Sequence, residues 1–169
     1  MAVLLNVSNI IDMSWTKDAA YQDHIKAILY IWQGGMEGAN AVADLLSGRV
    51  TPSGKLTDTI AEKLSDYPVA DHFGSKTENI YAEDIYVGYR YFDTFNVTPN
   101  YCFGYGKGYT DFETEVRDVE ADAKNVTVTA SVKNIGDTFA GKEVVQVYYS
   151  APDGTIEKPY QELGGFGKS

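Results

Sequence analysis

The sequence contains one adjacent pair of carboxylates within a segment rich in aromatic residues, Glu83 and Asp84 in YAEDIYVGYRYF. Two carboxylates that converge on one bond can act as nucleophile and general acid/base. Adjacent residues on an extended segment point to opposite sides, so these two side chains cannot reach one bond together. We expect Arg90 to form a domain-bridging ion pair with one of them, which gives the pair a structural role.

A second candidate is the glycine turn within AILYIWQGGMEGANAVADLLSG, which places Gly34, Gly35 and Gly38 between a strand and a helix. A dinucleotide site needs G-x-G-x-x-G spacing and a suitably placed acidic residue, and neither is present. The glycines therefore indicate close packing of the helix on the strand, where a Cβ atom would clash. The same loop can shape the rim of a pocket, because ligands in open α/β sheets bind beyond the carboxyl ends of strands.

Trp32 and Glu37 are the residues near this turn that we predict to bind a substrate. Trp32 ends a strand that is apolar on both faces, so its side chain is expected to lie half in the core and half in the pocket wall. Glu37 lies in the loop that would form the rim. We predict no catalytic residue in the chain.

Other reactive side chains are too few or too scattered to build a site. His24 and His72 do not form a metal cluster, and no serine or cysteine stands with histidine and aspartate at a nucleophile elbow. We predict no metal and no cofactor. Cys102, the single cysteine, is interpreted as a small buried side chain. It rules out an internal disulfide and slightly favours a cytoplasmic location.

Composition excludes two classes of partner. The 169 residues carry a net charge of −10 and show no basic stripe, which argues against nucleic-acid binding. No run of about 18 apolar residues predicts a membrane span. The composition is 44% hydrophobic and 13% aromatic, enough to build a packed core.

The first 66 residues have the pattern of a parallel α/β layer. VLLNVS (3–8) and AILYIW (27–32) are apolar on both faces, which is typical of strands covered on each side. A helix is expected over 14–27, with Ser14 as its N-cap. A second helix should follow Met36 and end at Gly48, with an apolar stripe at the spacing of a helix facing a sheet: Met36, Ala39, Val42, Ala43 and Leu46.

The pattern changes twice after residue 66. Residues 67–110 form a tyrosine-rich connector with few periodic segments, whose aromatic residues are expected to form a seam between two domains: Tyr81, Tyr86, Tyr89, Tyr91 and Phe92. In 111–169, NVTVTASVKNIG and KEVVQVYYS alternate apolar and polar residues, as half-buried antiparallel strands do. The acidic run DFETEVRDVEADAK predicts a solvated strand and turn. A β-sandwich normally needs about seven strands and only three or four are visible, so we expect a part of a larger protein.

Five stretches together resemble family 3 glycoside hydrolases, which include many β-glucosidases. GGMEGANAVADLLSGRVTPSGKLTDT resembles the end of the family's α/β-sandwich domain, and EDIYVGYRYFDT and FGYGKGYTDF resemble two aromatic signatures. VKNIGDTFAGKEVVQVYYSAPDG and KPYQELGGFGK resemble the first half of its fibronectin-III-like domain. Cys102 replaces the proline usual in the second signature, and Lys107 and Gly108 replace leucine and serine.

The resemblance implies the reaction of the parent enzyme. It would hydrolyse a terminal β-linked glucose or related sugar, from a β-glucoside or oligosaccharide, with retention of configuration. The nucleophilic aspartate would lie on a barrel that this chain lacks, and the acid/base glutamate upstream of VLLNVS. The isolated chain should therefore be inactive, and its open sheet edges should favour self-association or a partner chain with the missing segments. The alternative is a non-catalytic carbohydrate-binding or assembly module; a small dinucleotide enzyme is a weaker one.

Overall fold

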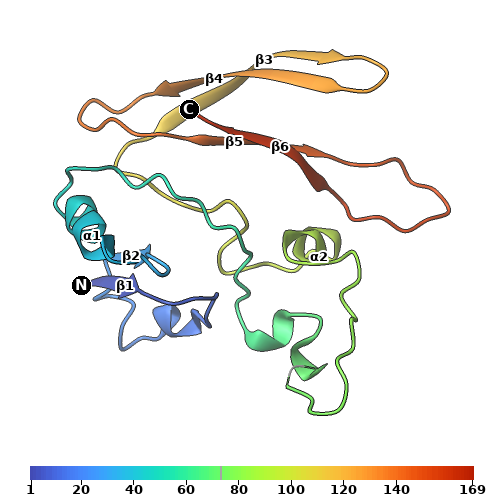
Figure 1. Cartoon of the computed structure of the whole chain (residues 1–169), viewed down its shortest axis with the longest axis horizontal. Helices are drawn as coiled ribbons and strands as arrows, with labels where there is room; N and C mark the ends of the chain where they lie inside the picture. The colour runs from blue at the N-terminus through green and yellow to red at the C-terminus, as the bar shows by residue number, and fades with distance from the viewer. Residues whose placement is uncertain (73) are drawn as a thin grey trace.

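The computed structural model describes residues 1–72 and 74–169 of the chain. Its N-terminal part contains β1 (Ala2–Leu5), β2 (Ala27–Tyr30) and α1 (Gly38–Leu46). A connector with the short helix α2 (Tyr89–Thr94) leads to β3 (Phe112–Ala121), β4 (Val126–Asn134), β5 (Val144–Tyr149) and β6 (Glu162–Lys168). Figure 1 shows the four long strands along one side of the molecule, with β1, β2 and α1 on the other side.

Strands β1 and β2 pair in parallel, with Ala2 opposite Ala27 and Leu5 opposite Tyr30. Both strands lie where the sequence predicts them, although each is only four residues long. Leu5 is buried, whereas Leu4, on the other face of β1, is 42% exposed. One face of this pair therefore remains uncovered, in contrast to the prediction that both faces are covered.

The predicted helix over 14–27 is wrong. The segment forms one turn of 3₁₀ helix, Ser14–Lys17, with Met13 rather than Ser14 at the N-cap position, and continues as turns. The Asp12 side chain accepts a hydrogen bond from the Ser14 amide at 2.7 Å, and the Asp18 side chain accepts one from the Ala20 amide at 2.8 Å. Such local bonds offer the backbone an alternative to helical bonding, and they explain why the helix does not extend.

Helix α1 begins two residues after Met36 and is followed by Gly48, as predicted. Gly48 adopts a φ of +75°, the left-handed conformation that commonly ends a helix. The predicted apolar stripe is present, yet no residue of α1 is buried and Met36 is 99% exposed. The stripe does not pack against a sheet within the described residues.

The buried core lies between the β1–β2 pair and the segment around residue 60. Its fully buried members are Met13 and Ile60, with Leu5 beside them. Ile60 forms an isolated antiparallel bridge with Tyr101, to whose carbonyl it donates its amide proton at 2.9 Å. This bridge brings the end of the connector back to the N-terminal part.

The last 58 residues form two antiparallel hairpins, β3–β4 and β5–β6. Bulges interrupt the register between Val116 and Asp118 and between Val147 and Tyr148. Strand β3 is exposed along nearly its whole length, which confirms the prediction of a solvated acidic strand. Strands β4 and β5 lie where the alternating patterns predict strands, and β3 lies in the acidic run. No alternating pattern predicts β6, whose sequence is ELGGFGK.

The predicted five-residue aromatic seam forms only in part, because the aromatic contacts of Tyr86, Tyr91 and Phe92 stay within the connector. Among the described residues, Tyr89 is the predicted member whose ring reaches a hairpin. Its ring centroid is 5.0 Å from that of Phe103 and 5.7 Å from that of Tyr148 on β5. The Tyr89 hydroxyl oxygen accepts a hydrogen bond from the Leu163 amide of β6 at 2.8 Å. Tyr81 is 85% exposed and does not belong to this seam.

Arg90 forms an ion pair between the connector and the hairpins, but not with the predicted partner. Its Nη1 lies 3.5 Å from Oε1 of Glu162 on β6, rather than beside Glu83 or Asp84. Helix α2 turns Arg90 toward the β5–β6 hairpin, because Tyr89 next to it is docked on Leu163. The bridging role is therefore correct and the partner is wrong.

Candidate functional site

A hollow of about 570 Å³ opens at the carboxyl edge of the parallel strand pair. Three segments line it: the chain after β1, the residue Trp32 after β2, and the loop that precedes Ile60. In open α/β sheets this edge is the usual place for a ligand. The residues that line the hollow are Ser8, Asn9, Ile10, Trp32, Thr57 and Asp58.

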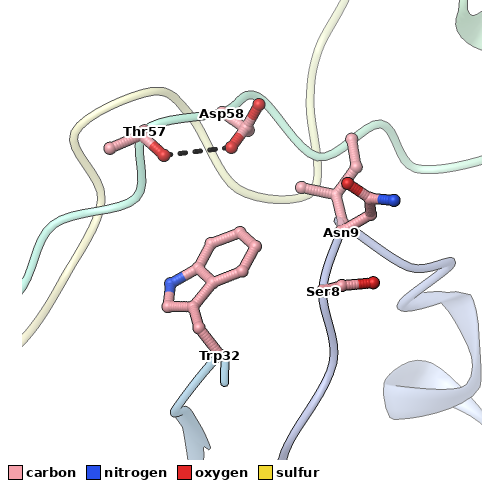
Figure 2. Close-up of a pocket in the computed structure, with 6 residues that line it drawn as sticks. Ser8, Asn9, Trp32, Thr57 and Asp58 are labelled. Carbon is pink, nitrogen blue, oxygen red and sulfur yellow. Dashed lines mark hydrogen bonds between the residues drawn. The ribbon is translucent and has the colours of Figure 1, made fainter. Parts of the chain in front are cut away.

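Trp32 is the aromatic wall of the hollow. Figure 2 shows its indole beside the segment of Ser8 and Asn9 and below the loop of Thr57 and Asp58. Its ring centroid is 4.6 Å from that of Tyr30. The backbone of Trp32 has a φ of +51°, which is rare for a bulky residue. Backbone strain of this kind concentrates at functional sites, where surrounding contacts hold it in place.

Tyr30 connects the two strand ends below the hollow. Its hydroxyl donates a hydrogen bond to the Asn9 carbonyl at 2.7 Å. Burial, with a smaller contribution from the negative charge of Asp58, raises the pKa of Tyr30, so the hydroxyl keeps the proton that it donates. The segment after β1 is thus fixed relative to Trp32 across a wide pH range.

The loop of Thr57 and Asp58 forms the third side. The Thr57 hydroxyl donates to Oδ2 of Asp58 at 3.0 Å, as Figure 2 shows. The loop is fastened at both ends, since the Leu56 amide bonds to the Tyr105 carbonyl and the Ile60 amide to the Tyr101 carbonyl. Asp58 is exposed and supplies the one carboxylate that lines the hollow.

Glu37 lies outside this lining. It precedes α1, is exposed, and its Oε2 accepts a hydrogen bond from the Asn40 side-chain amide at 2.6 Å. The structure thus brings Trp32, but not Glu37, to the hollow. The predicted close packing of the helix on the strand is not seen at these glycines. An added Cβ at Gly34 would lie 2.8 Å from the Gly38 Cα, within the same turn, and no described atom lies within 4 Å of one added at Gly35 or Gly38. Gly35 is instead required by its φ of +64°.

Four polar residues that line the hollow were not predicted from the sequence: Ser8, Asn9, Thr57 and Asp58. Ser8 and Asn9 could have been found, because they directly follow a predicted parallel strand. Thr57 and Asp58 could not, because their place depends on bonds to residues more than 40 positions away.

Cys102 is exposed, so the interpretation as a buried side chain is wrong. Its two neighbours, Tyr101 and Phe103, turn toward the core and the seam instead. Within 1–72 and 74–169, no group of three or more histidine, cysteine, aspartate or glutamate side chains could hold a metal ion. No helix in the described part of the chain is long and apolar enough to cross a membrane.

The sequence profile of the glycosyl hydrolase family 3 C-terminal domain matches residues 1–89, which is more than half of the chain. The chain belongs to glycosyl hydrolase family 3. The profile covers the hollow, helix α1 and the first aromatic signature as far as Tyr89.

Family 3 relatives match the chain over its full length. The beta-glucosidase of Ruminococcus albus is 48% identical over 170 residues, covering 100% of this chain and 17% of the relative. The crystal structure of a beta-glucosidase from Paenibacillus barengoltzii superposes with a TM-score of 0.94 at 51% identity, covering 99% of this chain and 19% of that one. Beta-glucosidase 3B from Thermotoga neapolitana in complex with glucose gives 0.88 at 43% identity, covering 99% and 23%. The chain thus spans about a fifth of the length of these relatives.

Proposed function

We propose that this chain is the scaffold and part of the pocket rim of a retaining β-glucosidase-type hydrolase. The main support for the proposal is that 99% of this chain matches a beta-glucosidase structure at 51% identity. The substrate class is a terminal β-linked glucose or a related sugar on a β-glucoside or oligosaccharide. The barrel and the remaining domain segments of the enzyme would lie on polypeptide outside these 169 residues.

The hollow has the chemistry of a sugar site but lacks that of hydrolysis. Trp32 offers an apolar ring face for a sugar, while Ser8, Asn9 and Asp58 offer hydrogen-bonding groups for its hydroxyls. Retaining hydrolysis needs two carboxylates about 5–5.5 Å apart, and only Asp58 lines the hollow. The resemblance instead implies that both catalytic carboxylates would lie on polypeptide outside these 169 residues. Glu37 stays a predicted substrate contact, which a longer oligosaccharide could reach from the rim.

Sugar binding can be tested with the two tryptophans, Trp15 and Trp32. In a Trp15→Phe variant of the chain, titration with glucose should change the fluorescence of Trp32. The matched variant Trp32→Phe, which keeps Trp15, should show no change with glucose. Equal responses from both variants, or none from Trp32, would contradict a sugar pocket at this edge.

Catalysis is tested separately with an aryl β-glucoside. The purified chain should release no aryl alcohol above a mock purification, because it lacks the carboxylate pair. Activity should require polypeptide with the barrel aspartate and the upstream glutamate. Turnover by the 169-residue chain alone would overturn the assignment of the catalytic groups.

The domain organisation is part of the proposal. Residues 1–66 would be the end of the α/β-sandwich domain, 67–110 the connector, and 111–169 the start of a fibronectin-III-like β-sandwich. Two features support it: the parallel pairing of β1 and β2, and the two antiparallel hairpins. Limited proteolysis should cut first within 67–110, and primary cleavage inside β3–β6 would argue against these boundaries.

The exposed apolar side chains of this chain favour association with other polypeptide. Four apolar side chains are each more than half exposed: Met36 before α1, Leu46 on α1, Val116 on β3 and Phe166 on β6. Exposed apolar surface of this kind marks contact with other polypeptide, either the missing domain segments or a second copy. Sedimentation velocity at increasing protein concentration should show self-association of the isolated chain. A monodisperse monomer at all concentrations would contradict it.

A further inference from the structure

The ion pair between Lys55 and Glu143 lies two residues from the pocket loop. Lys55 Nζ is 2.8 Å from Glu143 Oε1 and also donates a hydrogen bond to the Gly106 carbonyl at 2.7 Å. The two side chains are 18% and 23% exposed, the lowest values for any ion pair among the described residues. A pair so shielded from water is screened less than a surface pair.

The pair connects the pocket loop to the β5–β6 hairpin. Glu143 precedes β5, and its Oε1 also accepts a hydrogen bond from the Val144 amide at 2.8 Å. From β6, Lys168 Nζ donates to the Ser53 carbonyl at 2.8 Å. Residues 53–55 are therefore held from both strands of the hairpin, more than 80 positions away in the sequence.

Fixing Lys55 also fixes the start of the loop that carries Thr57 and Asp58. Leu56, the next residue, exchanges backbone hydrogen bonds with the 104–105 segment: its amide bonds to the Tyr105 carbonyl, and its carbonyl accepts from the Gly104 amide, both at 2.8 Å. Space behind the loop is tight, because a Cβ on Gly106 would lie 2.3 Å from the Gly54 carbonyl oxygen. The Lys55–Glu143 pair therefore adds a side-chain tether to the backbone bonds that fasten the start of the loop.

We propose that Lys55 and Glu143 are positioning residues, which hold Thr57 and Asp58 on the side of the hollow that faces Trp32 and so couple the β5–β6 hairpin to the hollow. The part of this inference that concerns sugar affinity rests on the proposed function of the hollow. The part that concerns loop position does not. Neither residue lines the hollow, so their effect on a ligand is indirect.

The charge state of Glu143 gives the coupling a pH dependence. Burial raises the pKa of Glu143, but the hydrogen bonds from Lys55 and the Val144 amide and the charges of Lys55 and Lys168 outweigh it, so the pKa lies below its ordinary value. The ion pair is therefore intact at neutral pH and is lost only as the pH falls through this lowered pKa. Above the ordinary glutamate range, the loop position should not change with pH.

The test measures how accessible Trp32 is. In the 169-residue chain carrying Trp15→Phe, acrylamide quenching of Trp32 reports the position of the loop, and glucose titration reports affinity. Glu143→Gln should increase quenching and weaken glucose binding about fivefold, the low end of typical coupling between sites. Lys55→Arg, which keeps the charge, should stay near wild type in both measurements.

The matched control is Glu62→Gln, which makes the same chemical change in the exposed Lys17–Glu62 pair. It should leave quenching and glucose affinity unchanged. The chain with Lys55 and Glu143 intact can also be titrated with acid. Quenching of Trp32 should stay constant above the ordinary pH range of glutamate titration and rise below it. Far-UV circular dichroism should stay constant, which shows that the chain remains folded. In Glu143→Gln the rise in quenching at acid pH should be smaller than in the chain with the intact pair, and the carboxylate of Asp58 at the hollow is the same in both.

The outcomes separate the two proposals. If glucose binds near Trp32 but Glu143→Gln changes neither quenching nor affinity, the positioning role is wrong and the sugar pocket stands. If Glu143→Gln increases quenching relative to Glu62→Gln while no variant responds to glucose, the positioning role stands and the sugar pocket fails. If Glu143→Gln unfolds, a flat acid titration of the intact pair would overturn the positioning role.

Discussion

The N-terminal part of the molecule and the β3–β6 hairpins differ in how they are held together. Leu5, Met13 and Ile60 are buried in the N-terminal part, and Phe92 is buried in α2 of the connector. No residue in the strands β3 to β6, each of which the structure describes in full, is buried. The hairpins nevertheless have the longest strands and the most extensive backbone pairing of the chain.

Different interactions therefore contribute to the free energy of unfolding in the two regions. Burial of apolar side chains stabilises the N-terminal part, since each buried aliphatic side chain contributes about 1.5–3 kcal/mol. The hairpins rely on backbone ladders and on contacts with the connector, because two-stranded hairpins are marginally stable in water. The seam around Tyr89 and the Lys55–Glu143 pair therefore hold the hairpins to the core.

The largest expected effect is at Ile60, which is 1% exposed. Ile60→Ala should lower the free energy of unfolding by about 2–5 kcal/mol, because it removes buried methyl groups and leaves a cavity. Ile156→Ala is the matched change in the loop between β5 and β6, where Ile156 is 74% exposed. It should change stability by less than about 0.5 kcal/mol. Equal losses in urea unfolding would show that the hairpins are also stabilised by burial.

The next effect is at Gly104, where the connector meets β5. Its φ of +78° makes any side chain strained, and an added Cβ would lie 2.6 Å from Oε1 of Gln146. Gly104→Ala should cost about 1–2 kcal/mol from the backbone conformation. It should cost about 1 kcal/mol more if Gln146 moves and loses its hydrogen bond from Tyr148.

Gly35→Ala separates these two contributions. Gly35 has a φ of +64°, but nothing lies within 4 Å of an added Cβ. It should show the backbone cost alone, so the difference between the two variants in urea unfolding measures the contact with β5. No difference would mean that Gln146 adapts freely and that this contact does not hold the hairpin.

The sequence predicted the fold where local patterns decide it. Alternation located β4 and β5, the acidic run located β3, and the two apolar runs located β1 and β2. The pattern failed at 14–27, where the side chains of Asp12 and Asp18 bond to nearby amides instead of permitting a helix. A helical pattern of side chains does not reveal this competition.

The sequence predicted only those residues of the candidate site that a local pattern places. Trp32 was found because it ends a predicted strand. Asp58 was not, because long-range backbone bonds place it, and a sequence does not display such bonds. Arg90 shows the same limit: its type and connector position predicted a bridging ion pair, but Glu162 is 72 residues away.

A smaller effect is expected at Tyr89, whose hydroxyl oxygen accepts the Leu163 amide proton. Tyr89→Phe keeps the aromatic packing on Phe103 but leaves this half-buried amide without its partner, which should cost about 1 kcal/mol. Tyr81→Phe is the control, because Tyr81 is exposed. Hydrogen exchange of the Leu163 amide should accelerate only in Tyr89→Phe. Unchanged exchange would show that β6 is held elsewhere.

The smallest effect is expected for Arg90 and Glu162, which connect the same two regions through charge. Their side chains are 31% and 36% exposed, so water screens the attraction. A double-mutant cycle with Arg90→Met and Glu162→Gln should give a coupling of about 0.2–1 kcal/mol, falling in high salt.

The same cycle at Arg117 and Glu115 is the control, because that pair lies within one strand and is more exposed. Its coupling should be smaller still. If the Arg90–Glu162 coupling instead exceeded 1 kcal/mol and persisted in high salt, charge rather than the aromatic contacts of Tyr89 would hold β6 to the connector. High salt would then weaken the attachment of β6 to the connector more than the loss of the Tyr89 contacts does. That result is the opposite of what the exposure of Arg90 and Glu162 predicts.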